Sequence, residues 1–357
     1  MESFFDSASA YLEPVHPYLS KAHVFFTATY IGFAASLLVG TFLFTFFVRC
    51  LFCRKKSVKG KSVFITGGST GIGYSIAEEY VKLGANVCIF ARTQSKLEVA
   101  KEKLLALRMD DSQNVDYACM DVTSAKSVRR AVDEGRGAVG QPDVLISAAG
   151  QAFPGYFLEQ KASVFEKTMQ LNYMGNIHVI KAVVPHMVAQ KSGQICIIAS
   201  AASVVSFIGY SSYAPTKFAL RGLADSLRTE LSGFGIQVSI AYPPDTDTPG
   251  FKLENEKKPK ETLACFPADP YSPVSVAQSV VDGVRMGDYH IQSPDLLQNL
   301  LVSSMSGVTP RAYAMLEILL LPIISLVEIP FYMWFDYQAR MYAGRVLRED
   351  AAVKKDK

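Results

Sequence analysis

The sequence predicts an α/β protein in which one doubly wound parallel sheet carries helices on both of its faces. Two observations predict this class. Short apolar runs rich in β-branched residues alternate with longer helix-like segments through the middle of the 357-residue chain. A glycine-rich turn at 66–73 directly follows the first of these runs. Strands that are apolar throughout are typical of parallel sheets covered by helices.

The predicted elements follow one another without a repeat or a low-complexity linker. Strands are expected at 62–66, 86–91, 115–120, 144–147, 194–199 and 237–242. Helices are expected at 72–83, 93–109, 164–171, 177–189, 213–231 and 274–286, with a further one from Val122 onward. Gly84 is placed to close the first helix. Residues 57–304 therefore form one domain.

The amino-terminal end predicts a transmembrane helix. Residues 24–48 contain no charged residue, and about 20 apolar residues span a bilayer. The downstream flank is basic, with Arg49, Arg54, Lys55, Lys56, Lys59 and Lys61. By the positive-inside rule we expect a lumenal tail at 1–23, a transmembrane helix at 24–53 and a cytosolic domain beyond it. A buried core helix is the alternative.

The carboxyl-terminal segment, 305–357, is apolar but irregular. Residues 318–334 are rich in leucine, isoleucine and aromatic side chains, yet they include Glu328, Pro322 and Pro330. A charge inside a bilayer is costly, and proline interrupts a regular helix. We therefore expect a membrane-associated segment that is re-entrant or interfacial, followed by a solvated lysine-rich tail. A second full membrane span is the alternative.

Composition excludes some classes of partner. The net charge of +3 and the lack of interleaved aromatic and basic residues argue against nucleic acid. The six cysteines do not form the pattern of a secreted disulfide framework. Cys50 and Cys53 have C-x-x-C spacing, but they end the apolar segment, where lipidation is favoured over a redox or metal role. No metal site is expected.

The glycine-rich turn predicts a dinucleotide site. Its pattern is T-G-x-x-x-G-x-G, in which Gly67 permits the tight turn and Gly71 lets the backbone approach a pyrophosphate. Gly73 lets the following helix pack closely on the strand, so that the helix amino terminus faces the anion. The expected cofactor contacts in this turn are Thr66, Gly67, Ser69, Thr70, Gly71, Ile72 and Gly73.

The end of the second strand bears on which cofactor binds. An acidic residue there would accept hydrogen bonds from an unphosphorylated ribose, but the sequence has Arg92, with Lys96 one turn later. A guanidinium binds phosphate in a fork, which favours NADPH over NADH. A solvated helix start is the alternative. Asp121 and Val122 follow the third strand, where Asp121 either meets the adenine or caps a helix.

Tyr213 and Lys217 predict proton transfer. They lie four residues apart, hence on one helix face, and a cation beside a tyrosine lowers the phenol pKa from about 10. Ser200 ends the fifth strand and is placed to hold a carbonyl oxygen, while Asn172 is placed to anchor a water near Lys217. Pro215 lies between the pair and is tolerated because early helix positions have no intrahelical donor to lose.

Together these residues resemble the short-chain dehydrogenase/reductase superfamily over residues 62–286. The resemblance implies a Rossmann-type fold and a catalytic set of Ser200, Tyr213, Lys217 and Asn172. It also implies cofactor contacts from Tyr213 and Lys217, and from Ala149, Gly150, Pro243, Thr246 and Thr248. One departure is the sequence Ser-Ala-Ala-Gly at 147–150, where the superfamily usually has Asn-Asn-Ala-Gly.

The run Pro-Pro-Asp-Thr-Asp-Thr-Pro-Gly-Phe at 243–251 resembles the 3-ketosphinganine reductase family. That resemblance implies NADPH-dependent reduction of a long-chain lipid ketone, 3-ketosphinganine, at the cytosolic face of the endoplasmic reticulum membrane. It further implies that 251–271 and 296–302 cover the acyl chain. Reduction of a steroid, retinoid or 3-ketoacyl thioester remains an alternative, as does a non-catalytic membrane scaffold. A homo-oligomer is left open.

Overall fold

The computed structural model describes residues 32–33, 36–37, 39–44, 46–47, 54–265, 269–311 and 313–355. These residues belong to two compact units. The larger unit comprises Arg54–Ala312 and Leu321–Lys357, and it contains the whole sheet. The smaller unit comprises the amino-terminal residues and Tyr313–Leu320.

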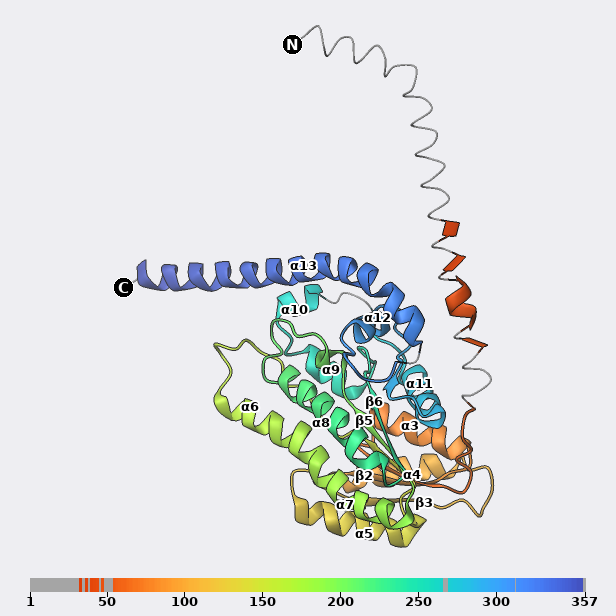
Figure 1. The fold of residues 1–357 in the computed structure, drawn as a ribbon. Coiled ribbons are helices and arrows are strands. Elements are labelled where there is room, and N and C mark those ends of the chain that lie inside the picture. Colours follow the sequence, from red (N-terminus) through yellow and green to blue (C-terminus); the bar gives the residue numbers. More distant parts are fainter. Residues whose placement is uncertain are drawn as a thin grey trace, which may run out of the picture. The chain divides into compact units, whose positions relative to one another are not determined.

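The larger unit is built on a seven-stranded sheet in which every strand pair is parallel, as predicted. The order is β3-β2-β1-β4-β5-β6-β7 (Figure 1). The strands are β1 (Ser62–Thr66), β2 (Asn86–Ala91), β3 (Val115–Cys119), β4 (Val144–Ser147), β5 (Gly193–Ile198), β6 (Ile236–Ala241) and β7 (His290–Ile291). The chain reverses its direction of progress between β1 and β4, which is where doubly wound sheets bind ligands.

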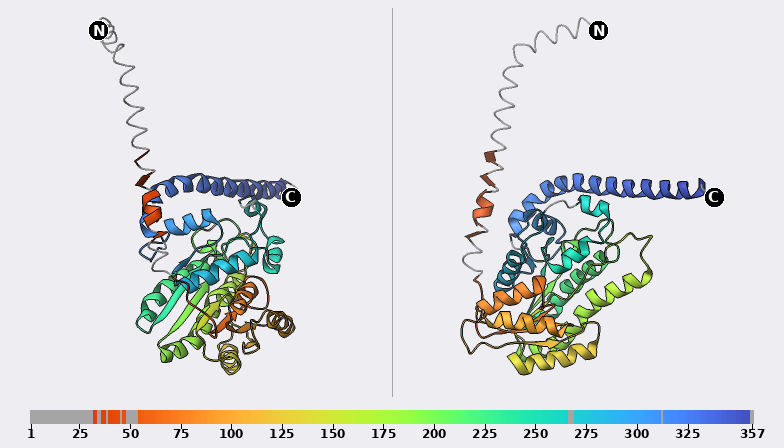
Figure 2. Two further views of the ribbon diagram at one scale, coloured as in Figure 1. Left: turned by 90° about the vertical axis from the view of Figure 1, so that its right-hand side faces the viewer. Right: turned by 180° about the vertical axis from the view of Figure 1, so that it is seen from behind.

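Helices cover both faces of this sheet (Figure 1; Figure 2). One face carries α3 (Gly71–Lys82), α4 (Gln94–Leu105) and α11 (Pro273–Met286). The other carries α5 (Ala125–Val139), α7 (Gly175–Gln190) and α8 (Ala214–Ser232). Along β1, Phe64 faces the second group while Val63 and Ile65 face the first, so the strand is buried on both sides. Burial from both sides explains the apolar strand patterns.

Several predicted boundaries are corrected by local capping and packing. The helix expected from Val122 begins only at Ala125, because Ser124 caps it through its side chain. The helix expected to reach residue 109 ends at Leu105. The two helices expected at 164–171 and 177–189 form one continuous run, in which α6 (Ala162–Met169) joins α7 through the π-helical turn η1 (Gln170–Met174).

The carboxyl-terminal half of the domain contains short helices and a short strand that the sequence did not indicate. The expected loop at 251–271 overlaps α9 (Pro249–Asn255) and contains α10 (Lys260–Cys265). The apolar stretch at 296–302 lies in α12 (Leu296–Ser304), whose amino end is capped by Asp295. The strand β7 is only two residues long, which is too short to show a period in the sequence.

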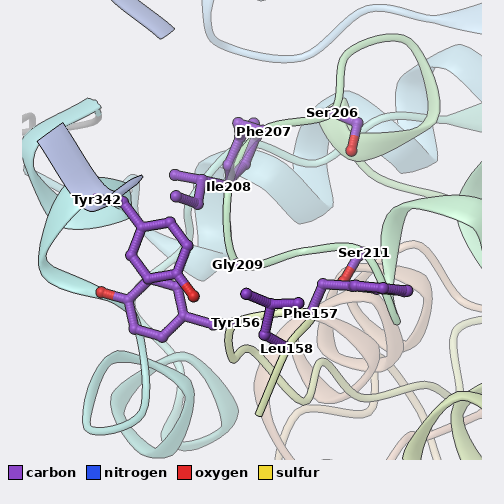
Figure 3. A pocket seen from close by; sticks show the side chains of 9 residues that line it. All are labelled: Tyr156, Phe157, Leu158, Ser206, Phe207, Ile208, Gly209, Ser211 and Tyr342. Atoms are coloured by element: carbon purple, nitrogen blue, oxygen red, sulfur yellow. The ribbon is translucent and has the colours of Figure 1, made fainter. Parts of the chain in front are cut away.

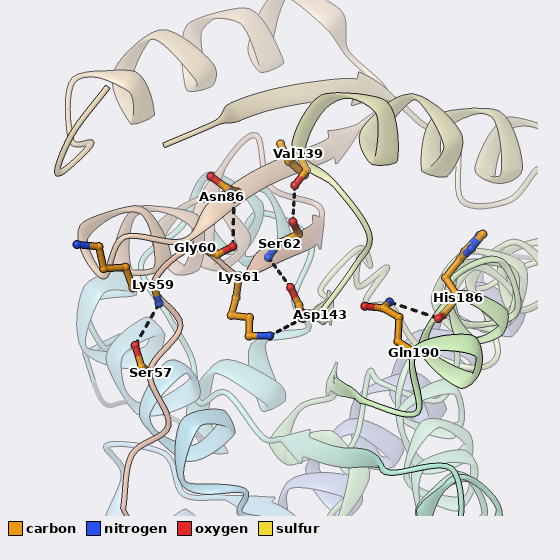
Figure 4. Close-up of polar contacts among 10 residues, drawn as sticks. All are labelled: Ser57, Lys59, Gly60, Lys61, Ser62, Asn86, Val139, Asp143, His186 and Gln190. Carbon is orange, nitrogen blue, oxygen red and sulfur yellow. Dashed lines mark hydrogen bonds and ion pairs between the residues drawn. The ribbon is translucent and has the colours of Figure 1, made fainter. Parts of the chain in front are cut away.

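A polar cluster fixes the amino ends of the central strands (Figure 4). The Asp143 carboxylate accepts a hydrogen bond from the Ser62 backbone N–H at 2.9 Å and one from the Lys61 ammonium at 2.9 Å. The Asn86 amide donates to the Gly60 carbonyl at 3.3 Å. These contacts tie the starts of β1, β2 and β4 together, on the edge opposite the predicted site.

The predicted membrane segments are covered unequally. The residues described between Gly32 and Phe47 are helical, whereas 1–23, most of 24–53, Cys50 and Cys53 lie outside the described residues. At the other end α13 (Ala314–Lys355) is one helix that contains Pro322 and Pro330, so the expected proline interruption is wrong. A proline removes one N–H and bends a helix without having to end it.

The helix α13 is also long and apolar enough to cross a bilayer. Its candidate span, Ala314–Glu349, reaches a mean hydropathy of 2.0 in its most apolar window, and only 6% of that window is buried. Among the described residues this is the one helix that passes such a test of length and composition. Membrane association of the carboxyl-terminal segment is therefore supported by an exposed apolar helix.

Candidate active site

The glycine-rich turn connects β1 to α3 and has the backbone that its sequence predicts. Gly67 and Gly71 adopt φ values of +68° and +61°, which side chains rarely tolerate. A Cβ on Gly73 would lie 2.4 Å from the Gly67 carbonyl oxygen, so only glycine fits there. Thr70 is the N-cap of α3, and its hydroxyl makes no capping bond. The turn thus presents an uncapped helix start, which suits a phosphate.

Thr66 joins the turn to the end of the neighbouring strand. Its hydroxyl oxygen accepts hydrogen bonds from the backbone N–H groups of Ala148, at 3.0 Å, and Ala149, at 3.1 Å. Because Thr66 is only 1% exposed, its side chain positions the backbone after β4 and is not open to a ligand. It therefore holds the Ala149–Gly150 backbone beside the glycine turn.

The segment after β6 closes the other side of this turn. A Cβ on Gly71 would lie 3.2 Å from Cγ2 of Thr248, so the two chains approach closely. The Thr248 hydroxyl caps α9 by accepting from the Phe251 N–H at 3.1 Å. The buried Thr246 hydroxyl donates to the Pro244 carbonyl at 2.7 Å. Both threonine hydroxyls shape the segment that the sequence assigned to the cofactor.

The predicted cofactor site also comes close to Lys217. Ser69 and Ile72 are half-buried in the turn, and Pro243 is buried with its carbonyl accepting from the Ala201 N–H at 3.4 Å. A Cβ on Gly150 would lie 3.7 Å from the Lys217 ammonium. Glycines thus keep open the surface that runs from the turn to Lys217, which is the space a dinucleotide requires.

The ribose end of the predicted cofactor site lies after β2 and β3. Arg92 and Lys96 are exposed and make no hydrogen bond or ion pair within the described part of the chain. The Asp121 carboxylate accepts from the Thr123 N–H at 2.9 Å and its hydroxyl at 2.7 Å. These bonds, with a smaller contribution from Arg92, hold the Asp121 pKa below its usual value. Asp121 therefore orders a turn and is not the N-cap of α5.

Val122 faces the protein interior. Its side chain is 6% exposed, and a Cβ on Gly175 would meet it at 2.8 Å. Its carbonyl is 2.9 Å from the ring nitrogen Nδ1 of His178. Val122 therefore joins β3 to α7, and any contribution to an adenine pocket would come from its backbone.

Tyr213 and Lys217 lie in the first turn of α8, as their spacing predicts. Tyr213 is the N-cap residue, and Pro215 occupies one of the first helical positions, where its missing N–H costs nothing. Lys217 is 5% exposed, and its ammonium donates to the Ile198 carbonyl at 3.0 Å. The same nitrogen lies 5.5 Å from the centre of the Tyr213 ring. The two side chains therefore lie together in the fold.

Burial moves the two pKa values apart. It lowers the pKa of Lys217 to about 8 and raises the pKa of Tyr213 above its ordinary value. The Glu254 carboxylate raises the Tyr213 pKa further, while a hydrogen bond with Ser200 opposes the rise. The expected lowering of the phenol pKa is therefore wrong, because desolvation by burial raises it.

Ser200 completes the group. It follows β5 and caps the short 3₁₀ turn η2 (Ala201–Ser203), accepting from the Ala202 N–H at 3.2 Å. Its hydrogen bond to Tyr213 brings both hydroxyls to one point at the carboxyl end of the sheet. A substrate oxygen at that point would meet two hydroxyl donors at once, which is an arrangement suited to a carbonyl.

Asn172 supports this group from behind. It is fully buried in the π-helical turn η1, a feature often found at functional sites. Its side-chain oxygen accepts from the Gln151 N–H at 2.9 Å, and its amide donates to the Gln151 carbonyl at 3.0 Å and the Thr216 hydroxyl at 3.1 Å. Asn172 therefore clamps the segment after β4 to the start of α8.

An acidic cluster beside Tyr213 was missed by the sequence reasoning. The ring of Tyr210 packs edge-on against that of Tyr213 at 5.8 Å, and the Tyr210 hydroxyl donates to the Glu254 carboxylate. The Lys258 ammonium lies 3.4 Å from Glu254 and 3.6 Å from Asp245. Burial raises the pKa of Glu254. The i, i+4 spacing of Glu254 and Lys258 was the available signal.

Comparison with known proteins identifies the family. A short-chain dehydrogenase family model matches residues 61–259. A "3-ketodihydrosphingosine reductase" of Dictyostelium discoideum is 40% identical over 76% of this chain and 86% of its own length. A "3-dehydrosphinganine reductase" of Danio rerio is 35% identical over 78% of this chain and 85% of its own length. This chain belongs to the 3-ketodihydrosphingosine reductase family of short-chain dehydrogenases.

Solved structures agree with the fold of this family. The crystal structure of levodione reductase superposes with a TM-score of 0.60 at 22% identity, covering 66% of this chain and 96% of that one. At that identity the likeness shows the fold alone. Family membership and the Rossmann-type sheet together imply a nicotinamide dinucleotide cofactor. The glycine contacts described above fit such a group.

Proposed function

We propose that this chain reduces 3-ketosphinganine to sphinganine with NADPH. The observation that carries the proposal is that Ser200, Tyr213 and Lys217 lie together at the carboxyl edge of a Rossmann-type sheet. Relatives that bear the names of this activity support the choice of substrate. A chain that had lost catalysis would have no need to keep these three side chains together.

NADPH is favoured over NADH by the residues after β2. Arg92 and Lys96 are exposed without protein partners in the described structure, and Ala91 stands where an acidic residue would select an unphosphorylated ribose. A guanidinium matches the geometry of a 2′-phosphate. The pyrophosphate would lie against the start of α3, and Gly150 and the segment after β6 would flank the nicotinamide.

Tyr213 acts as the acid. When bound, the reduced nicotinamide supplies a hydride to the ketone carbon. Burial keeps Tyr213 protonated at neutral pH, so its hydroxyl has a proton to give to the ketone oxygen. Ser200 holds that oxygen through a second hydroxyl. The nearby Lys217, with a pKa of about 8, is mostly cationic at neutral pH and stabilises the phenolate that donation leaves.

Asn172 and Thr66 are positioning residues in this scheme. Asn172 fixes the start of α8 through Thr216, and hence the placement of Tyr213 and Lys217. Thr66 fixes the backbone at Ala149 and Gly150, where the nicotinamide would lie. Neither side chain is open to a substrate, because Asn172 is 0% and Thr66 1% exposed. Their contribution is rigidity at the carboxyl edge.

The reaction is proposed to occur at the cytosolic face of the endoplasmic reticulum membrane. The chemistry of the substrate supports a membrane site, since a long-chain keto-amine stays in a bilayer. The exposed apolar helix α13 and the uncharged residues 24–48 support attachment to that bilayer. Basic residues after 48 support a cytosolic catalytic domain at 57–304, with a lumenal tail at 1–23.

The test uses the full chain in detergent, with NADPH oxidation measured on 3-ketosphinganine and NADH as the cofactor control. Tyr213→Phe should bind NADPH normally and lose nearly all turnover, whereas Tyr117→Phe on β3 should keep both. Normal turnover by Tyr213→Phe would refute the role of Tyr213. Reduction of steroid, retinoid or 3-ketoacyl ketones without 3-ketosphinganine would refute the substrate, and failure to bind NADPH would point to a scaffold.

A further inference from the structure

A pocket lies beside the segment that leads into Tyr213 (Figure 3). It measures about 180 Å³ and is lined by Tyr156, Phe157, Leu158, Ser206, Phe207, Ile208, Gly209, Ser211 and Tyr342. Most of these side chains are aromatic or aliphatic, so the pocket suits an apolar group. No carboxylate, ammonium or guanidinium group contributes to its lining.

Aromatic rings connect this pocket to the candidate catalytic residues. The ring of Phe207 lines the pocket and packs on Tyr210 at 4.7 Å between centres. Tyr210 in turn packs edge-on against Tyr213 at 5.8 Å. The backbone is fixed as well, because the Gly155 N–H donates to the Gly209 carbonyl at 2.9 Å. A group that touches Phe207 in the pocket is therefore connected to Tyr213 through two ring contacts, Phe207–Tyr210 and Tyr210–Tyr213.

The opposite wall of the pocket comes from the carboxyl-terminal helix α13. Tyr342 stacks on Tyr156 with the ring centres 4.2 Å apart and the planes within 6° of parallel (Figure 3). Earlier in the same helix, the ring of Phe335 packs against the ring of Phe207 with the ring centres 6.1 Å apart. A helix with an exposed apolar surface thus supplies part of the wall of this cavity.

Polar contacts among Arg345, Tyr156 and Glu261, called the latch below, hold α13 in this position. The Arg345 guanidinium donates to the Tyr156 hydroxyl at 2.6 Å and lies 3.0 Å from the Glu261 carboxylate. The Tyr156 hydroxyl donates to the same carboxylate at 2.5 Å. Glu261 is only 4% exposed, so Arg345 and Tyr156 are what compensate its burial. Removing Arg345 would leave a buried carboxylate without its cation.

We propose that this pocket receives the alkyl chain of the lipid ketone, and that Tyr342 and Arg345 make α13 a determinant of chain-length specificity. The proposal rests on the proposed function. The pocket is apolar, its Phe207 wall is connected to Tyr213 through the ring of Tyr210, and its other wall belongs to an apolar helix suited to a bilayer. An alkyl chain leaving a membrane would follow that helix into the site.

The main test compares a long-chain and a short-chain 2-amino-3-ketone as substrates of the full-length protein in detergent. Each methylene that loses its apolar contact should lower kcat/KM about fourfold. Tyr342→Ala should therefore lower kcat/KM for the long-chain ketone roughly tenfold or more, while the short-chain value and NADPH binding stay unchanged. Tyr337→Ala, at an exposed ring on the same helix, is the matched control.

The latch is tested by charge exchange. Arg345→Glu should reproduce the long-chain defect, and the double variant Arg345→Glu with Glu261→Arg should recover part of the loss, because the ion pair is rebuilt with reversed sign. Arg348→Glu, one turn away and exposed, is the control. An equal loss on long and short substrates in these variants, or no loss at all, would overturn the proposal.

A binding measurement separates this proposal from the proposed function. The long-chain amino-diol product should raise the thermal unfolding temperature of the wild type but not that of Tyr342→Ala. Stabilisation of the wild type without turnover of any keto-amine would refute the proposed reaction and leave the pocket assignment standing. Turnover with identical stabilisation of both proteins would refute the pocket assignment alone.

Discussion

Replacing Lys217 by methionine should remove activity and yet change stability in a way that depends on pH. The ammonium is 5% exposed and has one protein partner in the described structure, the Ile198 carbonyl at 3.0 Å. Burial lowers its pKa from 10.5 to about 8, which means that folding disfavours its charged form. Methionine has a similar length and no charge to bury.

The magnitude follows from the pKa shift. Below about pH 8 the folded protein carries the full cost of burying the charge, about 3 kcal/mol. The unfolded chain holds its proton up to about pH 10.5, so between these values it binds more protons than the folded state and stability rises with pH. Between about pH 7 and pH 9.5 the wild type should gain about 2 kcal/mol that Lys217→Met does not gain.

Loss of the hydrogen bond between Lys217 and the Ile198 carbonyl should destabilise the variant, which opposes the gain from removing the buried charge. Leaving the Ile198 carbonyl without a partner costs about 1–3 kcal/mol, so at neutral pH the variant should be between equal in stability and about 2 kcal/mol more stable. The difference between wild type and variant across pH is therefore the decisive quantity. Contributions from tyrosines and other lysines are common to both proteins and cancel in that difference.

The assay is urea unfolding of the full chain in detergent, without nucleotide, followed by circular dichroism at several pH values. Lys126→Met, at an exposed position on α5, should show no pH-dependent difference from the wild type. A Lys217→Met difference that stays constant from neutral to alkaline pH would refute the burial reasoning. So would a wild type that loses stability relative to the variant as pH rises.

Two further predictions concern the cofactor and the support of the site. Arg92→Ala should raise the KM for NADPH about 10- to 100-fold, because a charge-assisted hydrogen bond contributes about that much to binding. The KM for NADH should stay nearly unchanged, and Arg129→Ala is the control. Equal effects on both cofactors would contradict a contact between Arg92 and the 2′-phosphate. Asn172→Ala should lower the free energy of unfolding by about 3 kcal/mol, because Gln151 and Thr216 lose their hydrogen bonds to the buried Asn172 side chain. A urea midpoint equal to that of the wild type would contradict this prediction.

The sheet and its helices were predictable from the sequence because burial on both faces leaves a local signature. The strand 86–91 is apolar from Val87 to Ala91, and Gly84 marks the end of the preceding helix, so neither needed knowledge of the distant chain. The Tyr213–Lys217 spacing likewise defines one helix face. Pro215 fits because it lies in the first turn, where the structure places it.

Features made by distant segments were not predictable in this way. Glu254 approaches Tyr213 only through Tyr210, and no period in the sequence connects these residues. Arg345 meets Glu261 and Tyr156 across the fold. The prolines in α13 were expected to interrupt the helix because local propensity counts against them. The helix continues through them, since the loss of single hydrogen bonds does not prevent the following turn from forming.

The pKa of Tyr213 shows how tertiary structure can change a chemical inference while keeping its residues. From sequence, the nearby lysine was expected to lower the phenol pKa, which would leave part of Tyr213 ionised and unable to give a proton. In the structure burial raises that pKa, so the proton needed for reduction is retained. The same burial brings the Lys217 pKa to about 8, close to neutral pH. Lys217 then matters after proton donation, because a buried phenolate requires a cation beside it.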